Sequence, residues 1–482
     1  MLFNSYIFIL LFLPLCILGY FGLNWIKKTE FAQAFLLGMS LWFYGFYNPW
    51  YVLIIIASVL LNYLVYRFIQ KYRSKAKLFM VLGVAVNVGI LGYFKYMDFF
   101  IENVNAVFKS NISLLGIALP LGISFFTFQQ ISFVVDAYKG EVPDYGFLDY
   151  ACFVTFFPQL IAGPIVTHDE LVPQFMDSSK KKIDWDNFGK GLFIFTLGLA
   201  KKVLLADTLG IAVEYGYAIP GSINSTEAII VMLSYTLQIY FDFSGYCDMA
   251  LGIGKMLNID LPVNFNSPYK AVTITEFWDR WHMTLTRFLT KYIYIPLGGN
   301  RKGKVRTCIN VGLVFLISGL WHGADWTFVF WGAIHGLFMI IARITKKVYE
   351  KIPKIINWFI TFLFVNVAWV FFRADSFDEA KLLFSSMFAG NFGRVNPNFL
   401  ESFRRIEFKK ILSMVNLEDR FPEITMWGML AVALIIALLG KNSKNMMDKF
   451  KPSALNWILV VFLFVWSVFS LTGMSTFLYF NF

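Results

Sequence analysis

Three of the four histidines of this 482-residue chain lie within residues 276–336. His322 ends an apolar run, residues 311–321, that contains no charged side chain. An ionisable residue at membrane depth is costly to bury and by default marks a functional site. Because the histidine proton exchanges near neutral pH, His322 is a candidate general base. The alternative is an interfacial histidine whose ring reaches water at a helix end.

The composition indicates a membrane protein. Hydrophobic residues make up 58% of the chain and charged residues 15%, whereas soluble domains are about half apolar and about a quarter charged. The net charge of +11 lies in short loops between apolar runs, where it suits the lipid bilayer and not nucleic acid. The four cysteines have no paired spacing, so we expect no disulfide framework and no metal site.

Apolar runs of near-spanning length predict an all-α polytopic membrane protein with about ten to twelve transmembrane helices. The runs cover residues 5–23, 32–47, 50–69, 77–97, 114–135, 189–214, 227–255, 307–322, 326–343, 355–373, 425–440 and 454–473. Basic loops follow alternate runs, at residues 27–28, 70–77, 301–306, 345–351 and 441–451. By the positive-inside rule these loops are cytoplasmic, so both termini should lie outside. The first run lacks a basic start and a cleavage site, which predicts a retained span and not a signal peptide.

Three segments do not fit simple spans. Residues 146–166 are apolar but broken by proline and glycine, which predicts a re-entrant element lining a cavity. Residues 374–424 predict an external excursion of short helices. Residues 276–293 predict one amphipathic helix in the cytoplasmic interface, which would bring His282 to the mouth of the bundle. Its apolar face is Trp278, Trp281, Leu285, Phe288 and Tyr292, and its polar face is Arg280, Thr284, Arg287 and Lys291.

Other polar residues have structural interpretations. Asp242 and Asp248 lie six residues apart in an apolar helix and do not share a face, so each should bond a neighbouring helix or orient a histidine. His168 lies in a polar loop and is expected at the surface. His335 is off the face of His322 and is expected to pack or to form a hydrogen bond, with lining of the tunnel as the alternative. The stretch GGNRKGKV, residues 298–305, lacks the Ser or Thr of a phosphate loop, which makes a nucleotidase a poor interpretation.

Long motifs resemble the membrane-bound O-acyltransferase family. They are FWDRWHMTLTRFLTKYIYIPLGGNRKG, LWHGADWTFVFWGAIHG, SFFTFQQISFVVDAYKG, FFPQLIAGPI, QIYFDFSGYCDMALGIGKMLNIDLPVNFNSPYKA and VAWVFFRADSFDEA, which together cover most of residues 118–380. They are similar to the bacterial branch that contains the alginate O-acetyltransferase membrane subunit and the teichoic-acid D-alanine transfer protein. The stretch FPQLIAGPI is closer to the alginate and peptidoglycan acetylating members.

The resemblance implies a fold, a reaction and a site. The fold would be a single membrane domain, residues 1–482, with re-entrant and interfacial helices around a central tunnel. N-terminal helices would occupy residues 1–115, the catalytic core 116–380, and C-terminal helices with an external tail 381–482. His322 would be the catalytic base, and His282 would position the donor or stabilise the oxyanion. The donor would be acetyl-CoA or another acyl thioester, with no permanently bound cofactor and no metal.

The same resemblance implies donor contacts and partners. Basic and polar residues in and after the amphipathic segment would touch the donor phosphates; they are Arg280, Arg287, Lys291, Asn300 and Arg301. The alternative for the turn at residues 298–305 is a basic cytoplasmic loop without a binding role. The protein would lie in the bacterial cytoplasmic membrane and hand acyl groups to an extracytoplasmic SGNH-hydrolase-like transferase. That partner would acylate a cell-envelope or secreted polysaccharide.

The C-terminal stretch STFLYFNF has two interpretations. It resembles the F-x-Y-x-x-F motif of the microprotein beside the D-alanine transfer protein, which would make Tyr479 an acyl carrier and a catalytic residue. An aromatic membrane anchor is the alternative. Two alternative functions also remain at this point: D-alanyl transfer to teichoic acid, and a transporter or flippase that uses buried histidines and carboxylates as a proton relay.

Overall fold

A computed structural model describes residues 1–403, 413–414, 422–471 and 477–478, and within these residues every regular element is a helix. Seven helical segments of the described part are long and apolar enough to cross a membrane. They are Phe8–Trp25 (η1, Phe8–Phe12, and α1, Leu13–Trp25), α3 (Trp50–Lys71), Arg73–Phe108 (η2, Arg73–Lys75; α4, Ala76–Leu91; η3, Gly92–Tyr96; α5, Met97–Phe108), α12 (Ser225–Met256), α15 (Gly303–His322), α16 (Trp326–Ile344) and α18 (Lys354–Arg373). The predicted all-α polytopic membrane fold is therefore confirmed.

The count of seven is lower than the ten to twelve that the apolar runs predict, because several runs form shorter helices. α2 (Thr29–Gly45), α22 (Pro422–Leu439) and α24 (Ala454–Phe469) each have 16 to 18 residues. The run 114–135 becomes helical only in α6 (Ile123–Lys139). Pro120 disfavours helix before it, and Gly122 has φ +71°, where a Cβ would lie 2.8 Å from the carbonyl oxygen of Leu160.

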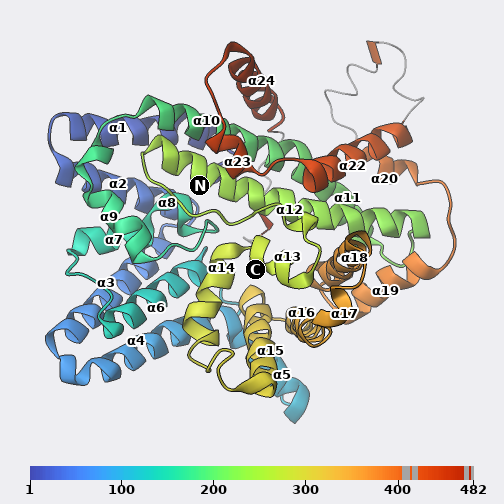
Figure 1. Ribbon diagram of the computed structural model, residues 1–482, viewed down its shortest axis with the longest axis horizontal. Coiled ribbons are helices and arrows are strands. Elements are labelled where there is room, and N and C mark those ends of the chain that lie inside the picture. Colours follow the sequence, from blue (N-terminus) through green and yellow to red (C-terminus); the bar gives the residue numbers. More distant parts are fainter. Residues whose placement is uncertain (404–412, 415–421, 472–476, 479–482) are drawn as a thin grey trace.

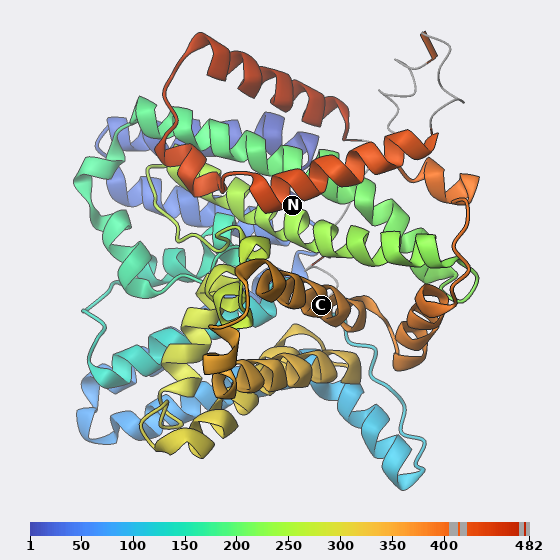
Figure 2. The ribbon, with the colours of Figure 1, turned by 45° about the vertical axis from the view of Figure 1, so that its right-hand side comes forward.

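The long helix α12 crosses the middle of the molecule beside α10 (Trp185–Ala200), as Figures 1 and 2 show. Two glycine pairs allow this contact. A Cβ on Gly198 would lie 2.5 Å from the carbonyl oxygen of Gly245, and a Cβ on Gly191 would lie 2.6 Å from that of Gly252. Small residues at such positions let two helix backbones approach closely, which is how membrane helices associate.

Buried ion pairs join the same helices. The helix of α10 continues through η5 (Lys201–Ala206), a π-helical turn, into α11 (Asp207–Ala218). Lys202 lies 2.6 Å from Asp242, and Lys201 lies 2.6 Å from Asp248. Each ammonium offsets the cost of burying the carboxylate that it faces. The prediction that Asp242 and Asp248 bond neighbouring helices is confirmed, and within the described residues their hydrogen bonds go to lysines, to Ser443 and to the backbone of Leu478, not to a histidine.

The broken segment 146–166 folds into the interior. It forms α7 (Phe147–Thr155) and α8 (Phe157–Leu160), followed by irregular backbone whose residues are buried through Val166. Irregular backbone at membrane depth is tolerated where it is buried in protein, as here. Farther along the chain, the excursion 374–424 contains the short helices α19 (Phe377–Phe388) and α20 (Pro397–Glu401), while residues 404–412 and 415–421 lie outside the described part.

Candidate active site

His322 is the last residue of α15 and is only 3% exposed. Gly323 ends the helix in an extended conformation, and α16 begins at Trp326 after an Asp325 cap. Aromatic rings enclose the imidazole: Trp331 lies edge-on with ring centroids 5.2 Å apart, and Phe372 lies 5.3 Å away. The side chain is therefore held inside the bundle and does not reach out from a helix end.

The predicted amphipathic helix 276–293 is wrong as a single element, because it breaks at His282. α13 (Ile274–Arg280) is capped by Trp281, and α14 (Met283–Leu289) starts after His282, followed by the π-helical turn η7 (Thr290–Tyr294). His282 has φ +46° and ψ +51°, a left-handed conformation that is uncommon for residues other than glycine. A non-glycine residue held in this region is a known sign of functional constraint.

The break carries His282 inward. Its side chain is fully buried, at 0% exposure, and does not lie at the mouth of the bundle. Thr284, predicted on the polar face, is also buried, and its hydroxyl accepts a hydrogen bond from the backbone N–H of Ile165 at 3.0 Å. The irregular end of segment 146–166 is thereby attached to α14. Burial lowers the pKa of His282 to about 3, so its imidazole is neutral at physiological pH.

Asn264 fixes the state of the His282 ring. Its Oδ1 accepts hydrogen bonds from the backbone N–H of Thr284 at 3.2 Å and from the Thr284 hydroxyl at 2.9 Å, and it lies 3.1 Å from His282 Nδ1. A backbone N–H can only donate, so the atom that faces it must be the amide oxygen. His282 Nδ1 must then carry the proton, and Nε2 is the unprotonated nitrogen of the neutral ring.

The two histidines lie together, with ring centroids 6.4 Å apart. The structure thus brings together the two residues that the sequence places forty positions apart. Trp321, the residue before His322 on α15, contacts both rings, with its centroid 4.9 Å from the His322 ring and 6.1 Å from the His282 ring. Such a close pair of buried, titratable rings, one of them on strained backbone, is a candidate catalytic centre.

Lys95 is the charged residue of this centre that the sequence analysis missed. Its ammonium, on η3, donates to the carbonyl oxygens of Trp321 at 2.6 Å and His322 at 3.0 Å, and contacts the Ser124 hydroxyl at 3.4 Å. A lysine at a helix C-terminus satisfies carbonyls that have no partner within the helix. The signal in the sequence is a second lysine within the apolar run 77–97, eighteen residues after the Lys77 that begins it.

Cavities approach this centre from two directions. Lys95 and His322 line a small cavity of about 20 Å³, and Lys95 also lines a cavity of about 310 Å³ with Asp98, Gly323 and Asp325 beyond the end of α15. On the other side, Trp278 and Thr286 line two adjoining clefts of about 260 and 330 Å³. The first of these clefts reaches Ser318, one helical turn before His322.

The residues predicted to bind donor phosphates are spread over different surroundings. Arg287 and Lys291 line the cleft of about 330 Å³, whereas Arg280, Asn300 and Arg301 do not. Each of the three helical cations faces a carboxylate: Arg287 faces Glu170 at 2.5 Å, Arg280 faces Glu276 at 2.6 Å, and Lys291 faces Asp136 at 3.0 Å. Asn300 and Arg301 lie exposed in the turn between η7 and α15.

The other two histidines lie outside this pair. His335 is buried and accepts a hydrogen bond from Trp278 Nε1 at 3.3 Å, in line with its predicted packing role. The prediction that His168 lies at the surface is wrong. It starts α9 (His168–Met176), is 3% exposed, and lies 3.7 Å from Asp136. Burial lowers the pKa of His168, so this ring is an interior histidine of the core and not a surface group.

Tyr479 lies outside the described residues. The chain just before it enters the bundle: Phe477 is buried against the Tyr246 ring, with centroids 4.6 Å apart, and the backbone N–H of Leu478 donates to Asp242 at 2.9 Å. The role of Tyr479 therefore stays a prediction.

A multi-pass helical membrane protein that encloses paired histidines between cavities has the organisation of an enzyme embedded in the bilayer. Comparison with known proteins identifies the family to which the chain belongs. The model of the membrane-bound O-acyltransferase family, MBOAT, matches residues 137–376. The chain is 42% identical to the peptidoglycan O-acetyltransferase of Helicobacter pylori, with 100% of this chain and 98% of that protein covered. The chain belongs to the membrane-bound O-acyltransferase family.

More distant relatives agree. The chain is 38% identical to the probable alginate O-acetylase AlgI of Pseudomonas aeruginosa, over 81% of this chain and 75% of that protein. It is 26% identical to the teichoic acid D-alanyltransferase of Bacillus subtilis, over 53% of this chain and 69% of that protein. The two relatives named for acetyl transfer are more similar to this chain than the D-alanyltransferase is. The protein is a multi-pass membrane acyltransferase. The family match therefore supports acyl transfer over the transporter alternative.

Proposed function

We propose that this protein moves an acetyl group from cytoplasmic acetyl-CoA through the membrane for O-acetylation of a cell-envelope or secreted polysaccharide. The full-length similarity to a peptidoglycan O-acetyltransferase is the observation that carries this proposal. The alginate-acetylating relatives extend the acceptor class to other polysaccharides. D-alanyl transfer is the less supported alternative, because those relatives cover about half of the chain at lower identity.

The clefts beside α14 suit the donor. Arg287 and Lys291 stand at the rim of the cleft of about 330 Å³, where phosphates would compete for them with the carboxylates of Glu170 and Asp136. The adjoining cleft has a mixed lining of apolar and polar residues, with Asp279 and Arg343 among the latter, and it reaches Ser318 on α15. We place the CoA phosphates at the rim and the thioester arm along this cleft, which would direct the acyl carbonyl toward His322. The positive-inside pattern supports a cytoplasmic position for this side and an external position for both termini.

His322 would act as the general base. It would take the proton from an acceptor hydroxyl as the hydroxyl oxygen attacks the thioester carbonyl carbon. The C–S bond would then break, and the same proton would pass to the departing thiolate, giving an acyl ester and CoA. The cavity of about 310 Å³ past the end of α15 would admit the acceptor.

The ring state of His282 favours one of its two predicted roles. Because Nδ1 carries the proton toward Asn264, Nε2 has no hydrogen to donate to an oxyanion. Positioning of the donor is therefore the better supported role. The oxyanion would instead face Lys95, whose ammonium lines the small cavity with His322.

Outside the membrane, the acyl group would be passed to an SGNH-hydrolase-like transferase and then to the polymer. Tyr479 would be the intermediate carrier if it serves as more than an anchor. In this scheme the tyrosine hydroxyl is the attacking group at His322, and the partner's serine later takes the acyl group from the tyrosyl ester.

The test is the acetate released by alkali from isolated envelope polymers of cells with matched amounts of each variant in the membrane. His322→Gln should abolish acetate above background. His335→Gln is the matched control, since it changes another buried histidine of the same helix pair and should retain wild-type acetate. Loss in Tyr479→Phe would support the carrier role, and retention would return Tyr479 to an anchor. Acetate that persists in His322→Gln would refute the proposed base.

A further inference from the structure

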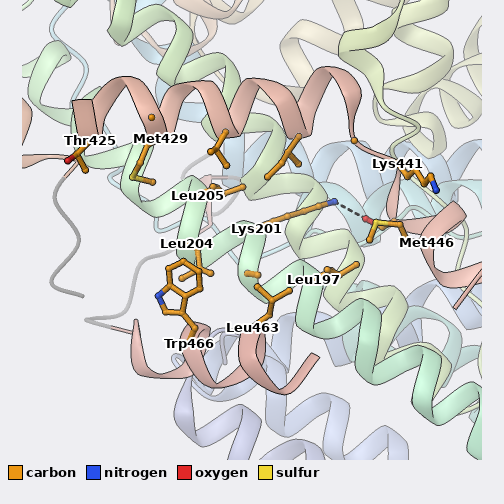
Figure 3. A pocket seen from close by; sticks show the side chains of 16 residues that line it. Leu197, Lys201, Leu204, Leu205, Thr425, Met429, Lys441, Met446, Leu463 and Trp466 are labelled. Carbon is orange, nitrogen blue, oxygen red and sulfur yellow. Dashed lines mark hydrogen bonds between the residues drawn. The ribbon is translucent and has the colours of Figure 1, made fainter. Parts of the chain in front are cut away.

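We propose that a groove between α10, η5, α22 and α24 binds an acyl chain of an anionic phospholipid, with its headgroup over the lysines of residues 441–451. The groove has a volume of about 850 Å³. Figure 3 shows α22 along one side and α24 along the other, with side chains of both pointing into the space between them.

The walls of the groove are hydrocarbon. Leu204 and Leu205 come from η5, Met429 and Val432 from α22, and Trp466 from α24. An apolar cavity stays free of water, because water molecules inside it would lack hydrogen-bond partners. The acyl chains of the surrounding bilayer are apolar, as the walls of the groove are, and can fill it. An acyl chain therefore fits this groove better than a polar metabolite does.

The polar residues of the groove gather at one end. Lys201 Nζ donates to Ser443 Oγ at 2.8 Å, the bond drawn in Figure 3, and lies 2.6 Å from Asp248. Because Asp248 balances this charge, Lys201 does not by itself select an anion. Its contacts do fix which end of the groove is polar, and Gly440 and Lys441 line that same end.

The net positive charge lies just beyond this end. Residues 441–451 contain four lysines, Lys441, Lys444, Lys449 and Lys451, and one acidic residue, Asp448. All four lysines are exposed. A basic cluster next to a membrane helix attracts anionic headgroups. The apolar walls and the basic end are thus arranged as the chain and headgroup of a phospholipid are, with the headgroup in the leaflet that the positive-inside pattern makes cytoplasmic.

Two glycines allow a matched test. A Cβ on Gly428, which lines the groove, would have nothing within 4 Å, so Gly428→Trp would fill the groove without a backbone clash. A Cβ on Gly89, on the exposed side of α4, also has nothing within 4 Å, and Gly89 does not line the groove. Gly89→Trp therefore controls for the added indole alone.

The measurement is native mass spectrometry of the full-length protein with phosphatidylglycerol or phosphatidylcholine of identical acyl chains. The wild type and Gly89→Trp should retain phosphatidylglycerol about tenfold more than phosphatidylcholine, the effect of one or two lysine contacts. Gly428→Trp should lose the phosphatidylglycerol adduct, and Lys441→Gln with Lys444→Gln should lose the preference. An unchanged adduct in Gly428→Trp, equal retention of the two lipids, or a bound polypeptide in place of lipid would overturn the proposal.

A second measurement does not depend on the folding of Gly428→Trp. Phosphatidylglycerol with brominated chains, present as a minor component of phosphatidylcholine vesicles, should quench the fluorescence of a tryptophan in the groove. Trp466→Phe should remove part of this quenching, whereas Trp25→Phe, an exposed tryptophan that does not line the groove, should not. Equal quenching in wild type and Trp466→Phe would contradict the site.

Discussion

Asn264→Leu tests whether the ring state of His282 matters for catalysis. Leucine keeps the approximate shape of asparagine but has no acceptor. Two fixed donors would lose their partner, the backbone N–H of Thr284 and Nδ1–H of His282. An unsatisfied buried donor costs about 1–3 kcal/mol, so the free energy of unfolding should fall by about 2–6 kcal/mol.

The effect on activity follows from the His282 bond alone. If that bond, worth about 1–3 kcal/mol, holds the ring in its working tautomer and orientation, its loss lowers the rate by about five- to 150-fold. The assay is alkali-released acetate divided by the amount of folded protein, which size-exclusion chromatography measures. The ratio separates catalysis from the loss of stability.

Cys247→Ala is the matched control. It removes only the partner of Asn264 Nδ2, the Cys247 sulfur at 3.4 Å, and leaves the Oδ1 contacts in place. Activity per folded protein should stay within about twofold of wild type, because no bond to His282 is lost. The reasoning fails if Asn264→Leu keeps wild-type activity per folded protein, or if Cys247→Ala loses as much.

Three further predictions concern charge, packing and pH. Lys95→Met should lower acetate transfer about 10²- to 10³-fold per folded protein, the effect of losing an oxyanion donor; a drop only in protein yield would limit Lys95 to capping α15. Gly198→Leu should abolish folded protein in the membrane, because its Cβ would lie 2.5 Å from the Gly245 carbonyl oxygen, whereas Gly22→Leu, with nothing within 4 Å, should not. Since burial lowers the pKa of His282 from 6.5 to about 3, its contribution to stability is complete above pH 6.5 and is lost as the pH falls. Between pH 6.5 and 5 the loss is about 2 kcal/mol, so thermal unfolding of His282→Gln should depend less on pH than that of wild type.

The sequence could predict those parts of the site that depend on local pattern. His322 stands out because it ends an uncharged run, and Asp242 and Asp248 stand out as carboxylates within an apolar helix. Their partners could not be read from pattern. Lys95 bonds a carbonyl 227 positions away, and Asn264 reaches His282 from the other end of α13, so only the packing of the chain shows either contact.

The errors have a common physical cause, which is tertiary structure overriding local periodicity. The helical spacing of residues 276–293 is real, yet the contacts of Asn264 with Thr284 and of the Asn264 carbonyl with the Met283 N–H hold the chain in a break at His282. His168 lies in a polar stretch but is buried beside Asp136, because α9 packs back onto α7. The polar sequence around His168 therefore did not indicate that the side chain is buried, because its carboxylate partner Asp136 lies in the interior.

The group that orients His282 argues for a division of roles between the two histidines. Asn264 is a neutral amide, so it orients His282 without the stabilisation that a carboxylate would give to an imidazolium. His282 therefore has no neighbouring carboxylate among its described contacts to assist it in taking up a proton. A group that must take up a proton and return it is then better sought at His322. If the roles were reversed, His282→Gln would abolish transfer while His322→Gln left a measurable rate, and acetate release from these two variants decides between the assignments.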